Sequence, residues 1–114
     1  MGDYDFDMGV LGGGAAGLTV ASGASQLGAK TLLIEKAPAL GGDCLHYGCV
    51  PSKTLIKSAH VYHLMKQASH FGLPDVDLPP VDFSAVSRRI RSVIDTIQAH
   101  DSVARFCGLG VQVL

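Results

Sequence analysis

The chain has 114 residues, 47% hydrophobic and 17% charged, which indicates a single globular domain with a substantial core and excludes a disordered protein. A net charge of -1 leaves no basic surplus for binding nucleic acid or an anionic membrane. Its apolar runs are too short to cross a bilayer, and Asp3, Asp5 and Asp7 stand where a secretory signal carries positive charge. We therefore expect a cytoplasmic protein without nucleic-acid or membrane partners.

The N-terminal part follows the pattern of a βαβ unit. Residues 8–11 form a short apolar run, residues 15–27 a helical pattern ended by Gly28, and residues 31–35 a second apolar run. Strand, glycine turn, helix and strand within about thirty residues predict two parallel strands joined by a right-handed crossover.

The turn in this unit carries a G-x-G-x-x-G pattern. Gly12 permits a tight turn, Gly14 lets the backbone approach a pyrophosphate, and Gly17 lets the helix pack closely on the strands. Glu35, eighteen residues after Gly17, is placed to accept hydrogen bonds from a ribose. The candidate dinucleotide-binding residues are Gly12, Gly14, Ala15, Ala16, Gly17, Glu35 and Lys36. Alternatively, the glycines serve only close helix–sheet packing and Glu35 is solvated.

The rest of the chain predicts two more helices and a strand. One helix begins near Pro51 and runs to residue 66, and the proline-containing stretch 71–81 reads as a surface connection. A further helix begins after the N-cap Asp82 and ends before Gly108, with an apolar face of Val86, Ile90, Val93, Ile94 and Ile97. Residues 111–114 start another strand.

Parallel sheets need both faces covered and usually have more than three strands. The fold class that we predict is therefore α/β: a Rossmann-like βαβ unit followed by a redox-active helix, in an incomplete three-layer domain. Residues 1–114 are expected to be the N-terminal segment of that domain.

Two cysteines, Cys44 and Cys49, lie five positions apart beside the nucleotide-binding pattern. In a regular helix this spacing gives roughly 7.5 Å of rise, beyond the ~7 Å Cα limit of a disulfide. Pairing therefore requires an irregular 44–49 segment, which Gly48 and Pro51 favour. The same arrangement puts Cys49 at a helix N-terminus, where the dipole favours a thiolate. A cytoplasmic dithiol of this kind indicates redox catalysis, redox sensing or metal binding.

The metal alternative uses Cys44, Cys49, His60 and His63, spaced C-x4-C-x10-H-x2-H. This spacing falls outside the usual zinc-finger range and leaves the glycine unit unexplained, so we predict no metal site. His60 and His63 then read as surface or half-buried helix residues, and Cys107 as a small core residue. Arg88, Arg89 and Arg91 read as a solvated face.

The run from Gly42 to Lys53, GDCLHYGCVPSK, after a G-x-G-x-x-G unit ending in an acid, resembles the flavin-binding part of the class I pyridine nucleotide-disulfide oxidoreductases. Ser52-Lys53 after the proline is most similar to the dihydrolipoamide dehydrogenase and mercuric reductase branches. The resemblance implies that FAD is the dinucleotide, that Cys49 is the thiolate beside the flavin, and that Cys44 is the more exposed thiol, which exchanges with substrate. It also implies that Gly42, Asp43 and Lys53 contact the cofactor.

By the same resemblance, electrons pass from NAD(P)H to FAD, to the Cys44–Cys49 disulfide and then to a small-molecule disulfide or metal ion. The family works as a homodimer with NAD(P)H-binding and dimerisation domains and a His–Glu acid–base pair, none of which we locate here. We therefore expect this chain to be inactive alone.

The motif departs from the usual family sequence at three positions: Asp43 replaces the usual Thr, and His46-Tyr47 replace Asn-Val. The alternative is a non-catalytic FAD-binding module or a dithiol redox sensor.

Overall fold

The computed structural model describes residues 3–114 as an α/β fold. Its strands are β1 (Met8–Leu11), β2 (Thr31–Ile34) and β3 (Val111–Val113). Its helices are α1 (Ala15–Gln26), α2 (Gly42–His46), α3 (Cys49–Lys66), the 3-10 helix η1 (Ala68–Phe71), α4 (Phe83–His100) and α5 (Val103–Gly108). The predicted α/β class, its βαβ unit and the strand near residue 111 are confirmed.

The three strands form one parallel sheet in the order β1-β2-β3, with β2 in the centre. Met8 of β1 lies opposite Thr31 of β2, which in turn lies opposite Val111 of β3. All three strands end at the same edge of the sheet because they run in parallel. The glycine turn follows β1 at this edge and Glu35 follows β2, so the topology gathers the two parts of the predicted nucleotide site.

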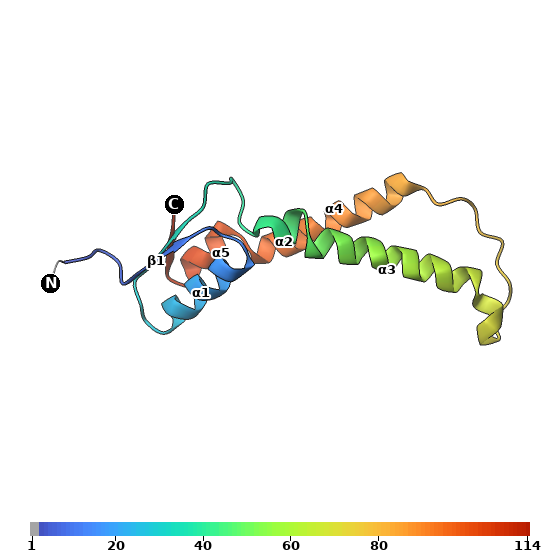
Figure 1. The fold of residues 1–114 in the computed structure, drawn as a ribbon, viewed down its shortest axis with the longest axis horizontal. Coiled ribbons are helices and arrows are strands. Elements are labelled where there is room, and N and C mark those ends of the chain that lie inside the picture. The colour runs from blue at the N-terminus through green and yellow to red at the C-terminus, as the bar shows by residue number, and fades with distance from the viewer. Residues whose placement is uncertain (1–2) are drawn as a thin grey trace.

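Helices α1 and α5 cover one face of this sheet (Figure 1). The buried cluster between them and the strands consists of Leu18, Ala21, Leu33, Leu40, Phe106 and Val111. The Ser25 hydroxyl of α1 donates a hydrogen bond of 2.6 Å to the carbonyl of Leu109, which ties α1 to the end of α5. Burying side chains such as Leu33 and Phe106 contributes about 1.5–3 kcal/mol each, and this cluster holds the glycine turn in place.

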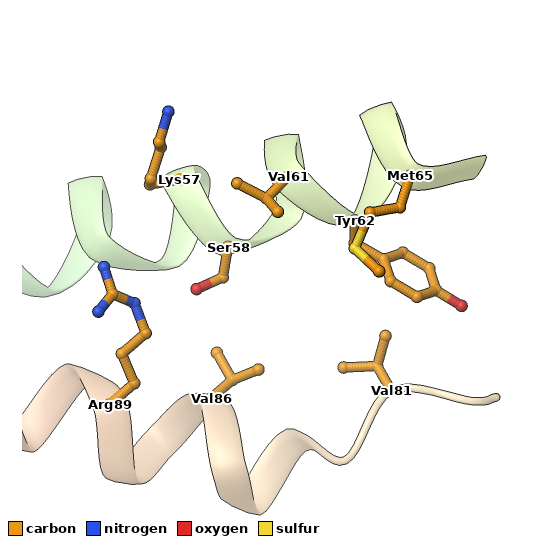
Figure 2. Close-up of a pocket in the computed structure, with 8 residues that line it drawn as sticks. All are labelled: Lys57, Ser58, Val61, Tyr62, Met65, Val81, Val86 and Arg89. Atoms are coloured by element: carbon orange, nitrogen blue, oxygen red, sulfur yellow. The ribbon is translucent and has the colours of Figure 1, made fainter. Parts of the chain in front are cut away.

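Helices α3 and α4 form a long hairpin that extends away from the sheet (Figure 1). It gives the described chain its elongated dimensions of 73 × 26 × 19 Å. The predicted apolar face of α4 is half-buried, at Val86, Ile90, Val93, Ile94 and Ile97. A groove of about 420 Å³ opens between the two helices, where Val61, Tyr62 and Met65 lie across from Val81 and Val86 (Figure 2).

The helix predicted between Asp82 and Gly108 is two helices in the structure. Asp82 caps α4 as predicted, since its carboxylate accepts a hydrogen bond of 2.9 Å from the Ser84 N–H. The single-helix prediction is wrong because Ser102 adopts an extended conformation and its hydroxyl accepts a hydrogen bond from the Arg105 N–H, starting α5. The break redirects the chain so that Phe106 enters the core at 2% exposure.

Three smaller predictions also need correction. Helix α3 begins at Cys49, two residues before Pro51, which is tolerated at the third position because an N–H there has no partner within the helix. Phe71 belongs to η1 rather than to the connection. Cys107 is exposed, because burying Phe106 turns the next residue of α5 away from the core.

Within residues 3–114, none of the helices combines the length and apolar character required to cross a membrane.

Candidate cofactor and dithiol site

The glycine turn between β1 and α1 has the geometry that its pattern predicts. Gly12 has a φ of +98°, a conformation that side chains with a Cβ rarely adopt. A Cβ on Gly17 would overlap the carbonyl oxygen of Gly12, so α1 passes too close to the turn for any larger residue. At Gly14 the space is open, with the Gly42 Cα 3.9 Å from where a Cβ would lie. Gly17 is thus required by packing, whereas Gly14 leaves room beside the helix.

Helix α1 begins at this open space without a side-chain cap. Gly14 is its N-cap and supplies no hydrogen-bonding side chain, and Ala15 and Ala16 in the first turn are exposed. Backbone N–H groups at a helix N-terminus carry partial positive charge. This arrangement suits an anion such as a pyrophosphate.

The segment that precedes the cysteines is docked on the glycine turn. The Gly41 N–H donates a hydrogen bond of 2.8 Å to the Gly13 carbonyl, and Gly14 and Gly41 form a parallel β-bridge. A Cβ on Gly42 would lie only 2.8 Å from the Gly14 Cα, so the two backbones are in direct contact. The two glycine-containing motifs, about thirty residues apart in sequence, therefore form a single backbone assembly.

Glu35 anchors this assembly from the end of β2. Its Oε2 accepts a hydrogen bond of 2.6 Å from the Gly13 N–H, and its Oε1 accepts one of 2.8 Å from the Ala37 N–H. These hydrogen bonds, first from Ala37 and then from Gly13, lower the pKa of the Glu35 carboxyl. Each carboxylate oxygen retains a lone pair that can accept a further hydrogen bond. The alternative of a merely solvated Glu35 is therefore wrong.

The lowered pKa of Glu35 predicts how the free energy of unfolding depends on pH. Because the folded-state pKa lies below that of the unfolded chain, Glu35 contributes stability fully above about pH 4.3 and loses it as the pH falls through the folded-state value. Glu35→Gln should lower the melting temperature at pH 7, and the difference from wild type should disappear in acid. Thermal melts of both proteins between pH 3 and 7 measure this, and a constant difference across the series would contradict the anchor.

A cavity of about 660 Å³ opens between the segment after β2 and helix α2. Its lining residues are Glu35, Lys36, Ala37, Pro38, Ala39, Gly42, Asp43, His46 and Tyr47. Four predicted cofactor-binding residues thus share one cavity: Glu35, Lys36, Gly42 and Asp43. The other predicted residues of the glycine turn lie at the start of α1, and Lys53 lies separately on α3.

The cavity also includes residues that sequence reasoning did not assign to the site. His46 and Tyr47 stand at the end of α2, and His46 Nε2 lies 3.1 Å from the Leu40 carbonyl oxygen. The available signal was the spacing of His46 from Gly42, since residues four apart share a face of a helix. This spacing does not predict a helix by itself, because a helix as short as α2 contains no repeat of apolar residues.

The cysteines lie on two helices that meet at a break. Cys44 is half-buried on α2, and Cys49 is the exposed first residue of α3, with Tyr47 and Gly48 between the helices. The expectation that Cys44 is the more exposed thiol is therefore wrong, because Cys44 lies inside α2 whereas Cys49 begins α3. The predicted break between the cysteines and the helix-terminal position of Cys49 are confirmed. Both thiols are free in this structure. Lys53 follows Cys49 by four residues and therefore shares its face of α3.

The side chain of Cys49 affects the acidity of the Cys44 thiol. The pKa of the Cys44 thiol is raised, first by the Cys49 side chain next to it and then by desolvation. Because of its raised pKa, the Cys44 thiol gives up its proton less readily than an ordinary thiol.

The zinc alternative conflicts with the shape of α3. His60 lies eleven positions after Cys49 in one continuous helix, which corresponds to about 16.5 Å of rise and is too far for two ligands of one ion. His60 and His63 are exposed, as predicted. Across residues 3–114, no three His, Cys, Asp or Glu side chains gather in a way that could hold a metal.

A parallel sheet, a glycine turn at a helix N-terminus and an adjacent dithiol define a Rossmann-like nucleotide-binding unit with redox-capable thiols. The sequence profile described as "Pyridine nucleotide-disulphide oxidoreductase" matches residues 6–108. The chain belongs to this family.

Individual relatives agree with this assignment. The chain is 42% identical to dihydrolipoyl dehydrogenase of Bacillus subtilis (strain 168) over 95 residues, 83% of this chain and 20% of that protein. It is 40% identical to dihydrolipoyl dehydrogenase of Zymomonas mobilis over 116 aligned positions, 96% of this chain and 24% of the relative. It is 51% identical to leghemoglobin reductase of Glycine max over 67 residues, 59% of this chain and 13% of that protein. The matched part of the chain therefore spans between 13% and 24% of the length of these relatives.

Proposed function

We propose that this chain is the N-terminal, FAD-binding and dithiol-bearing segment of an NAD(P)H-dependent oxidoreductase, a cytoplasmic homodimer when complete. The observation that carries the proposal is the docking of the cysteine segment on the nucleotide turn through Gly41, Gly42 and Gly13. A protein that used the glycines only for packing would not need a dithiol fixed beside them. Family membership and the relatives' names support the same function.

The residues present fit FAD. Gly14 leaves open space at the uncapped start of α1 for the pyrophosphate, with Ala15 and Ala16 next to it. Glu35 keeps lone pairs for the ribose hydroxyls, and the cavity beside it is large enough for part of a dinucleotide. Bound FAD would supply the relay of electrons between a nicotinamide and the dithiol.

The two thiols would carry out dithiol–disulfide exchange with the substrate. After removal of its proton, Cys44 attacks one sulfur of a substrate disulfide and releases the other sulfur as a thiolate. The Cys49 thiolate then attacks the Cys44 sulfur, which releases the second substrate thiolate and leaves a Cys44–Cys49 disulfide. Because the pKa of Cys44 is raised, a base must take its proton before the first step. The reverse sequence oxidises a dithiol.

For the substrate, we propose a small-molecule disulfide or its dithiol form, with a metal ion such as mercuric ion as the second candidate. Two of the relatives quoted above are named dihydrolipoyl dehydrogenases, which favours the first. A comparison of turnover with lipoamide and with mercuric ion, using NADH and NADPH in turn, separates these cases.

The cofactor assignment has a direct test. The complete protein that carries this chain should purify yellow, and denaturation should release FAD, identified by chromatography against FAD and FMN standards. A colourless protein whose absorbance and fluorescence do not change on addition of FAD would refute the proposed function.

A further inference from the structure

Gly48 stands at the junction of α2 and α3, where the two helices meet backbone to backbone. It is the N-cap of α3 and immediately precedes Cys49. A Cβ at this position would lie 3.0 Å from the carbonyl oxygen of Asp43 and 3.5 Å from the Cα of Cys44. The first distance is shorter than an ordinary van der Waals contact, so an added methyl group would displace the Asp43 carbonyl by a few tenths of an ångström. The absence of a side chain at Gly48 therefore lets the junction close.

The backbone around Gly48 is held in place on both helices. The Asp43 carbonyl oxygen accepts a hydrogen bond of 2.8 Å from the Tyr47 N–H at the end of α2. The other end of α2 is fixed by the backbone contact of Gly42 with the glycine turn. The Gly48 carbonyl accepts a hydrogen bond of 3.1 Å from the Ser52 N–H in the first turn of α3. A methyl group at Gly48 would thus press α2 and α3 apart, since the nearest atoms are backbone atoms rather than a flexible side chain.

This backbone contact controls the spacing of the two cysteines. A disulfide requires Cα atoms within about 7 Å, whereas five residues of regular helix give about 7.5 Å of rise alone. The junction brings Gly48 against the Cα of Cys44, and the Cα of Cys49 follows about 3.8 Å further along the chain. The backbone therefore keeps the two cysteines near one another even though both thiols are free.

On the basis of the proposed function, we propose that Gly48 is a positioning residue of the dithiol, whose missing side chain keeps Cys44 and Cys49 close enough to form their disulfide. A methyl group here would move Cys44 away from Cys49 and strain the disulfide, because this bond tolerates little deviation from its geometry. The reduced protein has no such bond, so its two thiols can separate at little cost. The substitution therefore acts on one redox state of the dithiol rather than on the fold.

The test is the exchange equilibrium of the complete protein with glutathione under anaerobic conditions. The two thiols form the Cys44–Cys49 disulfide, and oxidised glutathione takes up both electrons and both protons to give two molecules of reduced glutathione. Gly48→Ala should lower the equilibrium constant for disulfide formation about tenfold. Acid quenching, alkylation of the remaining thiols and mass spectrometry of the peptides measure this constant. Gly23→Ala is the matched control and should not change it, because a Cβ at this position of α1 has no neighbour within 4 Å.

Thermal melts and FAD content should show that reduced Gly48→Ala folds like wild type, because the required displacement is only a few tenths of an ångström. An equilibrium constant equal to that of wild type would overturn the positioning role. A reduced variant that melts far below wild type or loses FAD would also overturn it, because the glycine would then serve the fold as a whole. If the wild-type protein forms no Cys44–Cys49 disulfide at any ratio of the two glutathione forms, the proposed function itself fails, an outcome distinct from the others.

Discussion

Cys49→Ser in the complete protein should abolish turnover and also remove the long-wavelength absorption that a thiolate against oxidised flavin gives in the two-electron-reduced state. Cys44→Ser should lower turnover by roughly a thousandfold or more but keep this absorption. The reason is that the two thiols differ: the pKa of the Cys44 thiol is raised by the Cys49 side chain and by desolvation, whereas Cys49 is exposed at the first position of α3. Absorption spectra after titration with one equivalent of dithionite, together with steady-state rates, measure both effects.

Cys107 supplies the matched control for this experiment. It is also an exposed free cysteine, but it lies on α5 rather than at the junction of α2 and α3. Cys107→Ser should change neither the absorption nor the rate. If the absorption follows Cys44 instead of Cys49, the two roles are reversed, and if both variants keep full activity, the dithiol is not the catalytic centre.

Substitution by alanine should have different effects at Gly14 and Gly17 of the glycine turn: weaker FAD binding at Gly14 and lower stability at Gly17. Gly14→Ala should leave the melting temperature of the FAD-free protein unchanged, because the added Cβ meets nothing closer than 3.9 Å and the φ of −81° suits any residue. The same methyl group occupies the space proposed for the pyrophosphate and should weaken FAD binding at least about tenfold. Titration with FAD and thermal melts measure the two effects separately.

Gly17→Ala is the counterpart of that variant. Its Cβ would overlap the Gly12 carbonyl oxygen, so the FAD-free protein itself should be destabilised, by about 1–3 kcal/mol. A loss of stability in Gly14→Ala as large as that in Gly17→Ala would show that Gly14 serves packing alone. FAD binding unchanged by Gly14→Ala would remove the assigned pyrophosphate position.

Local patterns sufficed for the βαβ unit and for the two motifs. Two apolar runs of four residues predict β1 and β2, because buried parallel strands consist of short, continuous apolar segments. The glycine turn between the runs marks the start of α1. The Asp82 cap could also be read directly, since an N-cap side chain bonds to a backbone N–H two residues away. By contrast, no glycine or proline near Ser102 marks the end of a helix, and whether Ser102 caps a new helix depends on the burial of Phe106 in the core.

The sequence by itself determined the residues that need no distant partner for their role: the glycines of the turn, the acid after β2 and the spacing of Cys44 and Cys49. Only the tertiary structure decided that Gly42 contacts Gly14, that Glu35 bonds to Gly13, and that Tyr47 faces the same cavity. These arrangements bring together residues that are 12 to 28 positions apart, and no periodicity along the chain encodes them. They arise because a parallel sheet brings the ends of its strands to one edge, where loops with unrelated sequences meet.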